Sequence, residues 1–499
     1  MVVSFNSTRI FHRHFEMYRG SPMASTDVDQ DTRPPHLAII GGGVAGCAAA
    51  SWAASHGARV TLFNAGLPLG GACIHVGTFP ARLLMTAATD HHRAAHPRFA
   101  GLHTEAGRPE LSKLNDLRRK TSEELRNAYH HTLTTRPNVE LVEKPAFFID
   151  SETLRAGDET FAFDHVLLTP GSHSLWPELE GIDDVTPLAI ASLGDLGRLP
   201  ESLVFVEIND VAMVYAQLFA RLGTQVTILT EDREFFRRHH GPDAMEAMSE
   251  IVSLEDIEVH EEVALKAVHS DGDGVKLQGT RGGEEAHWHT EHFVVVDHRR
   301  PRIEHLGLDE AGVEVDEGGI LVIDESLQTT NPRVFAAGDA IGRGSHAYAA
   351  AYDAILAARN AIFPSRTAGH TTAVPFAIYT DPEFAGVGWS EHRACRAGFD
   401  ADTAVCPLDE LPAACAIGRR RGYVKLIRDR RSDRLVGARI FAPHAAELIM
   451  ELALAVRYGF AVSELGAFIH PPISLGEAIG RAARRFTPAS RPHAGRPSP

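Results

Sequence analysis

Two stretches of the chain place apolar, small and turn-forming residues in the order strand, turn, helix, strand. In the first stretch, His36–Ile40 predicts a buried strand, the small residues of Cys47–His56 predict a helix, and Ala58–Phe63 predicts a second strand. The second stretch, Leu199–Leu229, repeats this order. Two such βαβ units favour an α/β fold that contains a duplicated nucleotide-binding architecture.

The turn of the first unit carries glycines at a phosphate-binding spacing. Gly41, Gly43 and Gly46 form G-x-G-x-x-G between the strand and the helix. These glycines let the backbone approach a pyrophosphate, and the helix N-terminus adds partial positive charge. The alternative is a glycine turn without a ligand. Asn64 follows the second strand, at the position where a carboxylate usually binds a ribose, and an amide binds a hydroxyl more weakly than a carboxylate does.

Length and composition restrict the class of protein. A chain of 499 residues is too long for one core and suggests about three domains. The net charge of −16 opposes nucleic-acid binding, and no apolar run approaches the roughly 20 residues that a membrane helix needs. The five cysteines are scattered and have no zinc-ligand spacing, so we expect no metal site, no disulfide framework and a cytoplasmic location.

The two ends differ from the rest in composition. Residues 1–35 are expected to form a disordered extension, with a transit peptide or a translation start at Met23 as alternatives. Residues 486–499 are rich in proline and arginine and are expected to be a disordered tail. The segment Glu234–His240, "EFFRRHH", is expected to be a basic surface segment without a function.

Several further motifs carry a family resemblance that extends from His36 to Phe486. They are "LGGACIHVGTFPAR", "FDHVLLTPGS", "VFAAGDA", "IYTDPEFAGVGWSE" and "LVGARIFAPHAAELIMELALAV". Together with the first βαβ unit they resemble the class I pyridine nucleotide–disulfide oxidoreductases. The resemblance implies two Rossmann-like nucleotide-binding domains, of FAD and NAD(P) type, and a C-terminal α+β dimerisation domain. The expected domains are residues 36–185 with 300–370 for FAD, 186–299 for the NAD(P)-like domain, and 371–485 for the interface domain.

The resemblance also implies a cofactor and a quaternary structure. It implies a homodimer that acts on a small-molecule substrate. It further implies FAD, bound by residues of the glycine turn, the following motif and the two later FAD motifs: Gly41, Gly43, Gly46, Asn64, Gly71, Arg82, Gly171, Gly338 and Asp339.

The redox-active cysteine pair of the family is incomplete here. Cys73 matches the first, substrate-facing cysteine, whereas Thr78 occupies the position of the second. A threonine hydroxyl cannot cycle between oxidised and reduced states, so this segment cannot form the family's disulfide. Cys73 is either a reactive thiol or, as we favour, a partly buried cysteine without a redox role.

The acid/base histidine of the family is also replaced. In "FIHPPISLGEAI" the catalytic histidine falls at Pro472, which has no titratable group, while Glu477 matches the supporting glutamate. His470 matches a neighbouring family histidine, and we expect it to be structural.

The second βαβ unit departs from the family at its phosphate turn. The three glycine positions are Glu207, Asn209 and Ala212, and a glutamate adds negative charge where a pyrophosphate should lie. The family's acid later in this helix is Val214, and the glycine of a second signature is His298. The sequence therefore argues against ordinary NAD(P)H binding, with binding in an unusual pose as the alternative.

These departures support three hypotheses. The first is an FAD-dependent oxidoreductase, either an oxidase or a dehydrogenase, that acts on a small molecule directly at the flavin. Its candidate catalytic groups are Cys73, His75, Thr78 and Glu477. The second is a non-catalytic FAD-binding scaffold or regulatory dimer. The third is an NAD(P)H-dependent reductase of the dihydrolipoyl dehydrogenase or mercuric reductase type.

Overall fold

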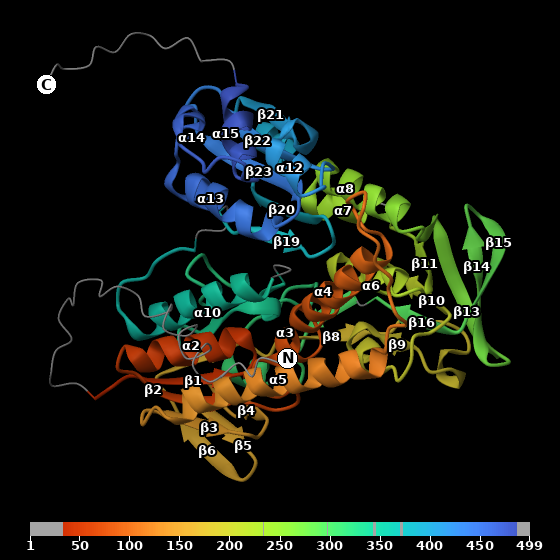
Figure 1. Cartoon of the computed structure of the whole chain (residues 1–499). Coiled ribbons are helices and arrows are strands. Elements are labelled where there is room, and N and C mark those ends of the chain that lie inside the picture. The colour runs from red at the N-terminus through yellow and green to blue at the C-terminus, as the bar shows by residue number, and fades with distance from the viewer. Residues whose placement is uncertain (1–32, 233, 297, 343–345, 370–372, 487–499) are drawn as a thin grey trace, which may run out of the picture.

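The computed structural model describes residues 33–232, 234–296, 298–342, 346–369 and 373–486. The described chain forms three units, each built around its own sheet (Figure 1). Almost all of the predicted extension and tail lie outside the described residues. The strands of the three main sheets fall within the ranges predicted for the three domains.

The first unit has a parallel sheet with the strand order β18-β7-β1-β2-β3. Its central strand β1 is buried along its whole length, as its composition predicts. Helices α2 and α10 are rich in alanine, and they pack side by side over the sheet because small side chains allow close approach (Figure 1). The strands and helices are β1 (His36–Ile40), α2 (Val44–Ser55), β2 (Arg59–Phe63), β3 (Val139–Val142), β7 (His165–Leu168), β18 (Val334–Ala336) and α10 (Ala347–Ile362).

The second unit has a parallel sheet with the order β12-β11-β10-β16-β9. Along β10, Leu203 and Phe205 pack on the helical side, whereas Val204 and Val206 pack on an antiparallel three-stranded layer, β13-β14-β15. This alternation follows from the two-residue period of a strand. The elements are β9 (Leu188–Ala189), β10 (Ser202–Val206), α6 (Asp210–Arg221), β11 (Gln225–Thr230), α7 (Phe235–His240), α8 (Pro242–Leu254), β12 (Glu258–Glu261), β13 (Val263–Asp271), β14 (Gly274–Arg281), β15 (Glu284–Thr290) and β16 (His292–Val295).

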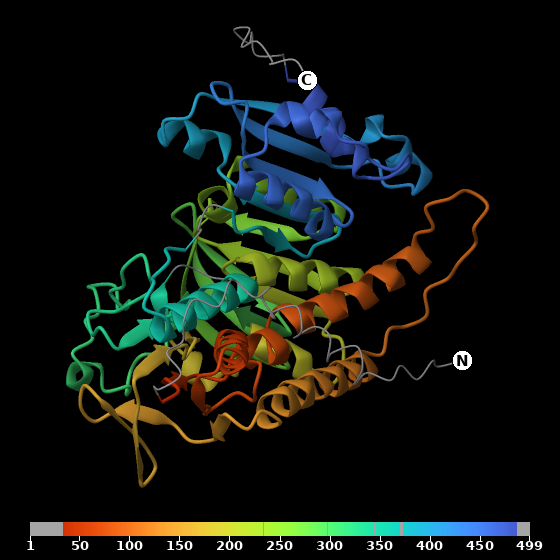
Figure 2. The same cartoon turned by 90° about the vertical axis from the view of Figure 1, so that its left-hand side faces the viewer.

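The C-terminal unit is α+β, with an antiparallel sheet of order β19-β20-β23-β22-β21. Figure 2 shows this unit, in blue, stacked above the other two. Its elements are β19 (Phe376–Ile378), β20 (Glu383–Gly388), α11 (Glu391–Arg396), β21 (Ala401–Pro407), α12 (Pro412–Ala416), β22 (Tyr423–Asp429), β23 (Leu435–Ala442), α13 (Ala445–Tyr458), α14 (Val462–Ala467) and α15 (Glu477–Arg484).

Helix α4 connects the units, because it leaves the first unit and packs against α6 of the second (Figure 2). The remaining elements are α3 (Gly71–His75), α4 (Thr78–Ala95), α5 (Leu111–Thr134), β4 (Ala146–Phe148), β5 (Thr153–Ala156), β6 (Glu159–Ala162), β8 (Ser172–Leu175), β17 (His298–Pro301) and α9 (Leu308–Ala311). The predicted α/β class, with two nucleotide-binding units and an α+β domain, is confirmed.

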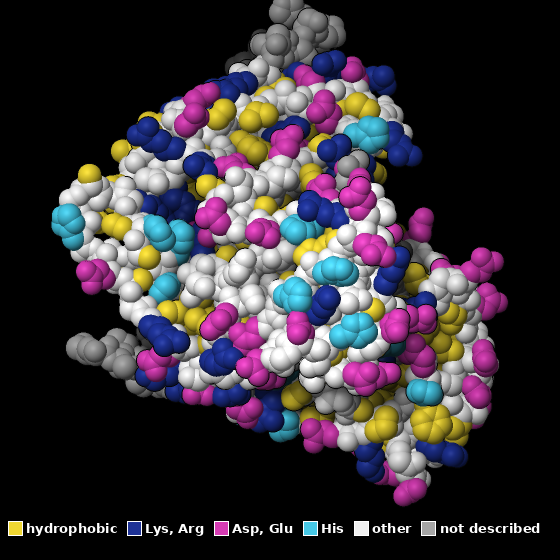
Figure 3. All heavy atoms as spheres, turned by 90° about the vertical axis from the view of Figure 1, so that its right-hand side faces the viewer, with side chains coloured by type: hydrophobic (Ala, Val, Ile, Leu, Met, Phe, Trp, Pro, Cys, Tyr) yellow, Lys and Arg dark blue, Asp and Glu magenta, His cyan; other side chains and the backbone are white. Residues whose placement is uncertain are grey.

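The surface and the helices agree with the charge and hydropathy of the sequence. On the face shown in Figure 3, Lys and Arg side chains are interspersed with Asp and Glu side chains and do not gather into a basic patch. Within the described part of the chain, no helix has the length and apolar character needed to cross a bilayer.

A buried ion-pair cluster joins the second unit to the C-terminal unit. Arg221 on α6 pairs with Asp381 at 2.8 Å and with Glu255 at 2.6 Å, and it donates to the Thr89 hydroxyl of α4 at 3.0 Å. Arg419 pairs with the same Asp381 carboxylate. Burial alone raises the pKa of Asp381, but the paired guanidinium groups of Arg419 and Arg221 outweigh burial and hold the pKa well below its usual range. The cluster therefore fixes the relative positions of α4, α6 and the segment that carries Asp381.

Replacing this carboxylate should destabilise the joint between the units. Asp381→Asn leaves Arg221 and Arg419 without their shared anion, which costs about 3 kcal/mol and lowers Tm by about 3 °C or more. The measurement is thermal unfolding followed by circular dichroism. The control Glu123→Gln removes an exposed pair with Arg126 on α5 and should change Tm by less than about 1 °C. Equal Tm values for the two variants would contradict the role of the cluster.

Candidate functional site

The glycine turn after β1 has the geometry of an anion-binding helix start. Gly41 has φ of 112°, and a Cβ placed there would lie 2.1 Å from the Thr169 carbonyl oxygen. A Cβ at Gly46 would lie 1.9 Å from the Gly41 carbonyl oxygen. Gly43 is the N-cap of α2, where a Cβ would meet open space and no side chain caps the helix. The first-turn N–H groups of α2 therefore face a space that suits a phosphate.

The residues after the turn are tied to it. The Asn64 side-chain oxygen accepts from the Gly42 N–H at 3.2 Å, and its amide donates to the Leu67 carbonyl at 3.2 Å. A Cβ at Gly71, the first residue of α3, would lie 2.9 Å from the Gly43 Cα. Helix α3 therefore begins directly against the phosphate turn, which places Cys73 near it.

The two later glycines and Asp339 meet beside the same helix. Gly171 and Gly338 have φ of 74° and 73°, in the left-handed region that favours glycine. The Ser172 hydroxyl donates to Asp339 at 2.5 Å, and Arg299 lies 3.7 Å from the same carboxylate. A Cβ at Gly338 would lie 3.8 Å from the Ala45 Cβ of α2. An open glycine turn with a carboxylate beside it fits a dinucleotide that carries sugar hydroxyls, as FAD does.

The turn before α6 is built differently. Glu207 has φ of 70°, and its carboxylate accepts from the Thr230 hydroxyl at 2.9 Å and from the Glu231 N–H at 3.1 Å. The Asn209 side chain caps α6 by accepting from the Ala212 N–H at 2.8 Å. The first turn of α6 thus uses a side chain of its own where the first turn of α2 has none.

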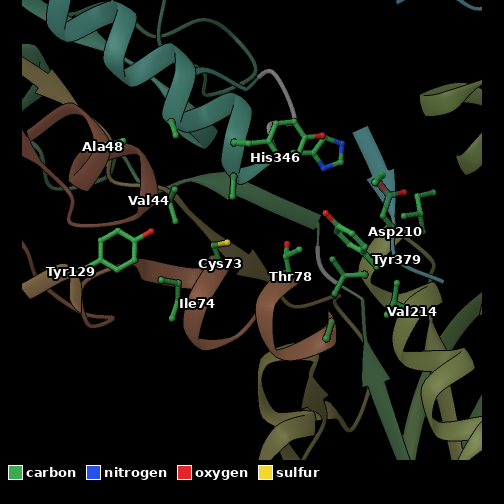
Figure 4. Close-up of a pocket in the computed structure, with 17 residues that line it drawn as sticks. Val44, Ala48, Cys73, Ile74, Thr78, Tyr129, Asp210, Val214, His346 and Tyr379 are labelled. Carbon is green, nitrogen blue, oxygen red and sulfur yellow. The ribbon is translucent and has the colours of Figure 1, made fainter. Parts of the chain in front are cut away.

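A cavity of about 300 Å³ lies where the three units meet (Figure 4). Helix α2, which begins at the glycine turn, contributes Val44 and Ala48 to the cavity wall. A molecule bound at the turn can therefore extend into the cavity. The rest of the wall comes from α3, α4, α5, α6, the start of α10 and the strand β19. The polar lining residues are Cys73, Thr78, Tyr129, Asp210, His346, Tyr348 and Tyr379.

Two of the four predicted catalytic residues lie together in this cavity. Cys73 on α3 and Thr78 at the start of α4 both line it (Figure 4). Burial raises the pKa of the Cys73 thiol to about 11, so the thiol is protonated at neutral pH. All five cysteines lie in the described part of the chain and each is a free thiol.

The other predicted residues point elsewhere. His75 donates to the Leu69 carbonyl at 3.1 Å. Glu477 accepts from the Ile473 N–H at 2.8 Å at the start of α15. Arg82, predicted to contact the cofactor, pairs with Glu383 of the C-terminal unit at 2.6 Å. These three residues therefore take no part in the cavity lining within one chain.

His470 and His298 are the remaining positions singled out from the sequence. His470 pairs with Glu451 of α13 at 3.1 Å, so it packs within the C-terminal unit. His298 is the first residue of β17, which pairs antiparallel with β8.

Sequence reasoning missed Asp210, His240 and His346. Asp210 and His346 line the cavity, and His240 Nε2 lies 2.8 Å from an Asp210 carboxylate oxygen. The segment Glu234–His240 was expected to lie on the surface, but its last residue is half-buried against Asp210. The adjacent histidines of "RRHH" were the available signal, and only the fold shows which one faces inward.

Comparison with known proteins identifies the family. The chain matches "Pyridine nucleotide-disulphide oxidoreductase" over residues 35–354 and the dimerisation domain of the same family over residues 374–483. It is 33% identical over 478 residues to the mercuric reductase of Acidithiobacillus ferrooxidans, covering 94% of this chain and 85% of that protein. It is 29% identical over 451 residues to the dihydrolipoyl dehydrogenase of Geobacillus stearothermophilus, covering 89% and 94%.

Solved structures show the same fold. The HOCl-induced flavoprotein disulfide reductase RclA from Escherichia coli superposes with a TM-score of 0.80 at 23% identity, covering 91% of this chain and 100% of that one. This likeness covers all three units. The family matches and the relatives together show that the chain belongs to the pyridine nucleotide-disulphide oxidoreductase family, whose members bind FAD.

Proposed function

We propose that the protein is an FAD-dependent oxidoreductase in which a small molecule reacts directly at the flavin, without a redox-active disulfide and without ordinary NAD(P)H binding. The observation that carries this proposal is the contrast between the two helix starts. The first turn of α2 has open space and no side-chain cap, whereas Asn209 caps α6. One unit is therefore suited to a dinucleotide and the other is not.

The glycine turn and its surroundings are the part of the chain that would hold FAD. When bound, FAD supplies two-electron chemistry that no side chain of this cavity offers. The residues suited to holding it are those of the open turn, the adjoining α3 start and the Asp339 region: Gly41, Gly43, Gly46, Asn64, Gly71, Gly171, Gly338 and Asp339. Arg82 would act on the cofactor only after leaving Glu383.

The altered turn of α6 supports the loss of ordinary NAD(P)H binding. Glu207 brings a carboxylate to the end of β11, where it takes the Glu231 N–H. A pyrophosphate at this turn would meet that negative charge and would have to displace the Asn209 cap. Both substitutions therefore act against the same anionic group.

The cavity supports chemistry without a disulfide. Cys73 has Thr78 rather than a second sulfur beside it on the cavity wall, and burial keeps its thiol protonated. A protonated lone thiol cannot relay two electrons by disulfide exchange. Pro472 cannot transfer protons for such an exchange.

An exposed apolar surface on the C-terminal unit supports a homodimer. Exposed Met450 and Leu454 lie on α13, and Phe468, Ile469 and Ile473 lie in the loop before α15. Ile469 is 89% exposed, which is costly for a large apolar side chain in water. This surface lies within the matched dimerisation domain, so we infer that a second copy covers it.

A conventional NAD(P)H-dependent reductase is the second candidate. Mercuric reductases that are up to 33% identical over most of the chain favour it. The two candidates differ in whether a reduced nicotinamide can deliver electrons to the flavin.

Anaerobic mixing of the FAD-loaded protein with NADPH or NADH distinguishes them. We expect the flavin absorption band to persist with both nucleotides and to bleach with dithionite, because the α6 turn repels the pyrophosphate. The double variant Glu207→Gly/Asn209→Gly restores an open turn and should bind a nucleotide at least about tenfold more tightly. Rapid bleaching of the unmodified protein by either nucleotide would instead establish the conventional reductase.

Cys73 should react slowly with a maleimide at pH 7.5. With its pKa raised to about 11, its thiolate fraction is about 100-fold smaller than that of a thiol with a pKa of 9.0. Peptide mass spectrometry of the timed reaction gives the rate, and exposed Cys395 is the internal control. If Cys73 reacts as fast as Cys395, it is an activated thiol and the proposed chemistry must include it.

A further inference from the structure

A carboxylate–imidazole pair forms the α6 side of the cavity. Asp210 is the first residue of α6 and lines the cavity, and His240 ends α7. His240 Nε2 lies 2.8 Å and 3.0 Å from the two Asp210 carboxylate oxygens. The His240 ring stacks on Phe376 of β19 with centroids 4.5 Å apart. The pair is therefore held in one geometry by three elements.

A second imidazole lies at the same end of the cavity. His346 is the N-cap of α10 and lines the cavity with Asp210 (Figure 4). It stacks on Tyr348 at 5.4 Å with ring planes 9° apart, and on Phe376 at 6.3 Å. Phe376 thus stacks with both histidines, and this packing limits the movement of their rings.

The surroundings of His346 favour its neutral imidazole, which can accept a proton. Burial lowers its pKa, and the positive charge available to His240 lowers it further, while the Asp210 carboxylate raises it. Burial raises the pKa of Asp210, but His240 outweighs burial and the pKa lies below its usual value, so Asp210 is ionised at neutral pH. The other titratable groups facing this end are Cys73, His239, Tyr348 and Tyr379, with Arg82 behind the Tyr379 ring. Arg439 of β23 lies over the Phe376 ring and donates to the His240 carbonyl at 3.3 Å.

We propose that Asp210 and His346, with His240 as a positioning residue, form the proton-transfer group of this cavity and take the place of the histidine that Pro472 replaces. This inference rests on the proposed function, because it assigns the acid/base group of the same direct reaction. It also places that group where the starts of α6 and α10 meet the cavity, above and to the right of Cys73 and Thr78 in Figure 4.

The substrate class follows from the groups that line the cavity. A proton acceptor beside a hydride acceptor suits a molecule H–C–X–H, where X is the oxygen of an alcohol or the nitrogen of an amine. The C–H bond breaks, and its electron pair would pass as hydride to a flavin bound at the glycine turn. The X–H bond breaks, its proton goes to the His346 imidazole, and a C=X double bond forms. The substrate thereby loses two electrons and two protons.

The same lining disfavours anionic substrates. Among the described residues that line the cavity, the ionised Asp210 is present and neither Lys nor Arg is, and most of the remaining wall is apolar, as at Val44, Ala351 and Ile378. A carboxylate or phosphate would lose its hydration there without gaining a cation. A neutral or cationic molecule with an apolar body fits these walls.

The test measures how many protons accompany two-electron reduction of the FAD-loaded protein. Reduction of a flavin bound in this cavity would add negative charge and so raise the pKa of His346. At pH values between the pKa of His346 in the oxidised protein and its pKa in the reduced protein, we expect reduction to be accompanied by uptake of one further proton. The readout is the slope of the flavin midpoint potential against pH between pH 6 and 9, with dithionite and redox dyes as reductant. No substrate is needed.

The variants separate this role from a structural one. His346→Gln should lose the further proton, and Asp210→Asn should shift its uptake to lower pH, because the carboxylate no longer stabilises the imidazolium. His240→Gln should shift the uptake to higher pH, because the positive charge that lowers the pKa of His346 is removed. His269→Gln, an exposed histidine on β13, should behave as the unmodified protein. The FAD content of each variant is measured first, and Asp210→Asn decides the outcome if His346→Gln does not retain FAD.

An unchanged slope in both His346→Gln and Asp210→Asn would overturn the proposal. Failure of the proposed function has a different signature. In that case NADPH or NADH rapidly bleaches the flavin band, while the slope of the midpoint potential against pH still depends on His346. A slope that is independent of His346 in a protein that NAD(P)H cannot reduce would remove this inference alone.

Discussion

The N–H groups in the first turn of a helix need acceptors, and the two βαβ units meet this need in opposite ways. At α2 the glycine turn keeps side chains away, so an external anion can supply the acceptor. At α6 the Asn209 side chain supplies it, and the Glu207 carboxylate ties the turn to the end of β11. The same local architecture therefore produces a cofactor cradle in one unit and a closed turn in the other. Everything proposed about this protein depends on that difference.

The cavity exists because three units, each built around its own sheet, converge on one space. Its walls come from the cofactor-facing end of α2, the Cys73 segment, the start of α6 and the strand β19. The Asp381 cluster holds α6 and the C-terminal unit at a fixed separation, and Arg82 adds a second connection through Glu383. Ion pairs behind the cavity wall thus hold the elements that give the cavity its shape.

Because the turn before α2 is open and the turn before α6 is capped, the residues available for proton transfer in the cavity differ from those of the family. The family position at Pro472 offers no proton transfer, and Thr78 offers no sulfur. The start of α6 instead presents Asp210 with His240 behind it. The proposed loss of the nucleotide site and the proposed acid/base pair at the same helix N-terminus are consistent, because in both a carboxylate of the chain takes the place of a bound anion.

The sequence by itself determined the fold class, the glycine turn, Asp339 and the replacements at Thr78, Pro472 and Glu207, since each depends on local spacing or on side-chain chemistry at one position. Only the tertiary structure decided that Arg82 turns to Glu383, that His75 bonds to a backbone carbonyl, and that His240 reaches Asp210. Those partners lie on different elements, and their contact depends on how helices and sheets pack. Local periodicity specifies which face of an element is buried, but not which distant side chain lies against it.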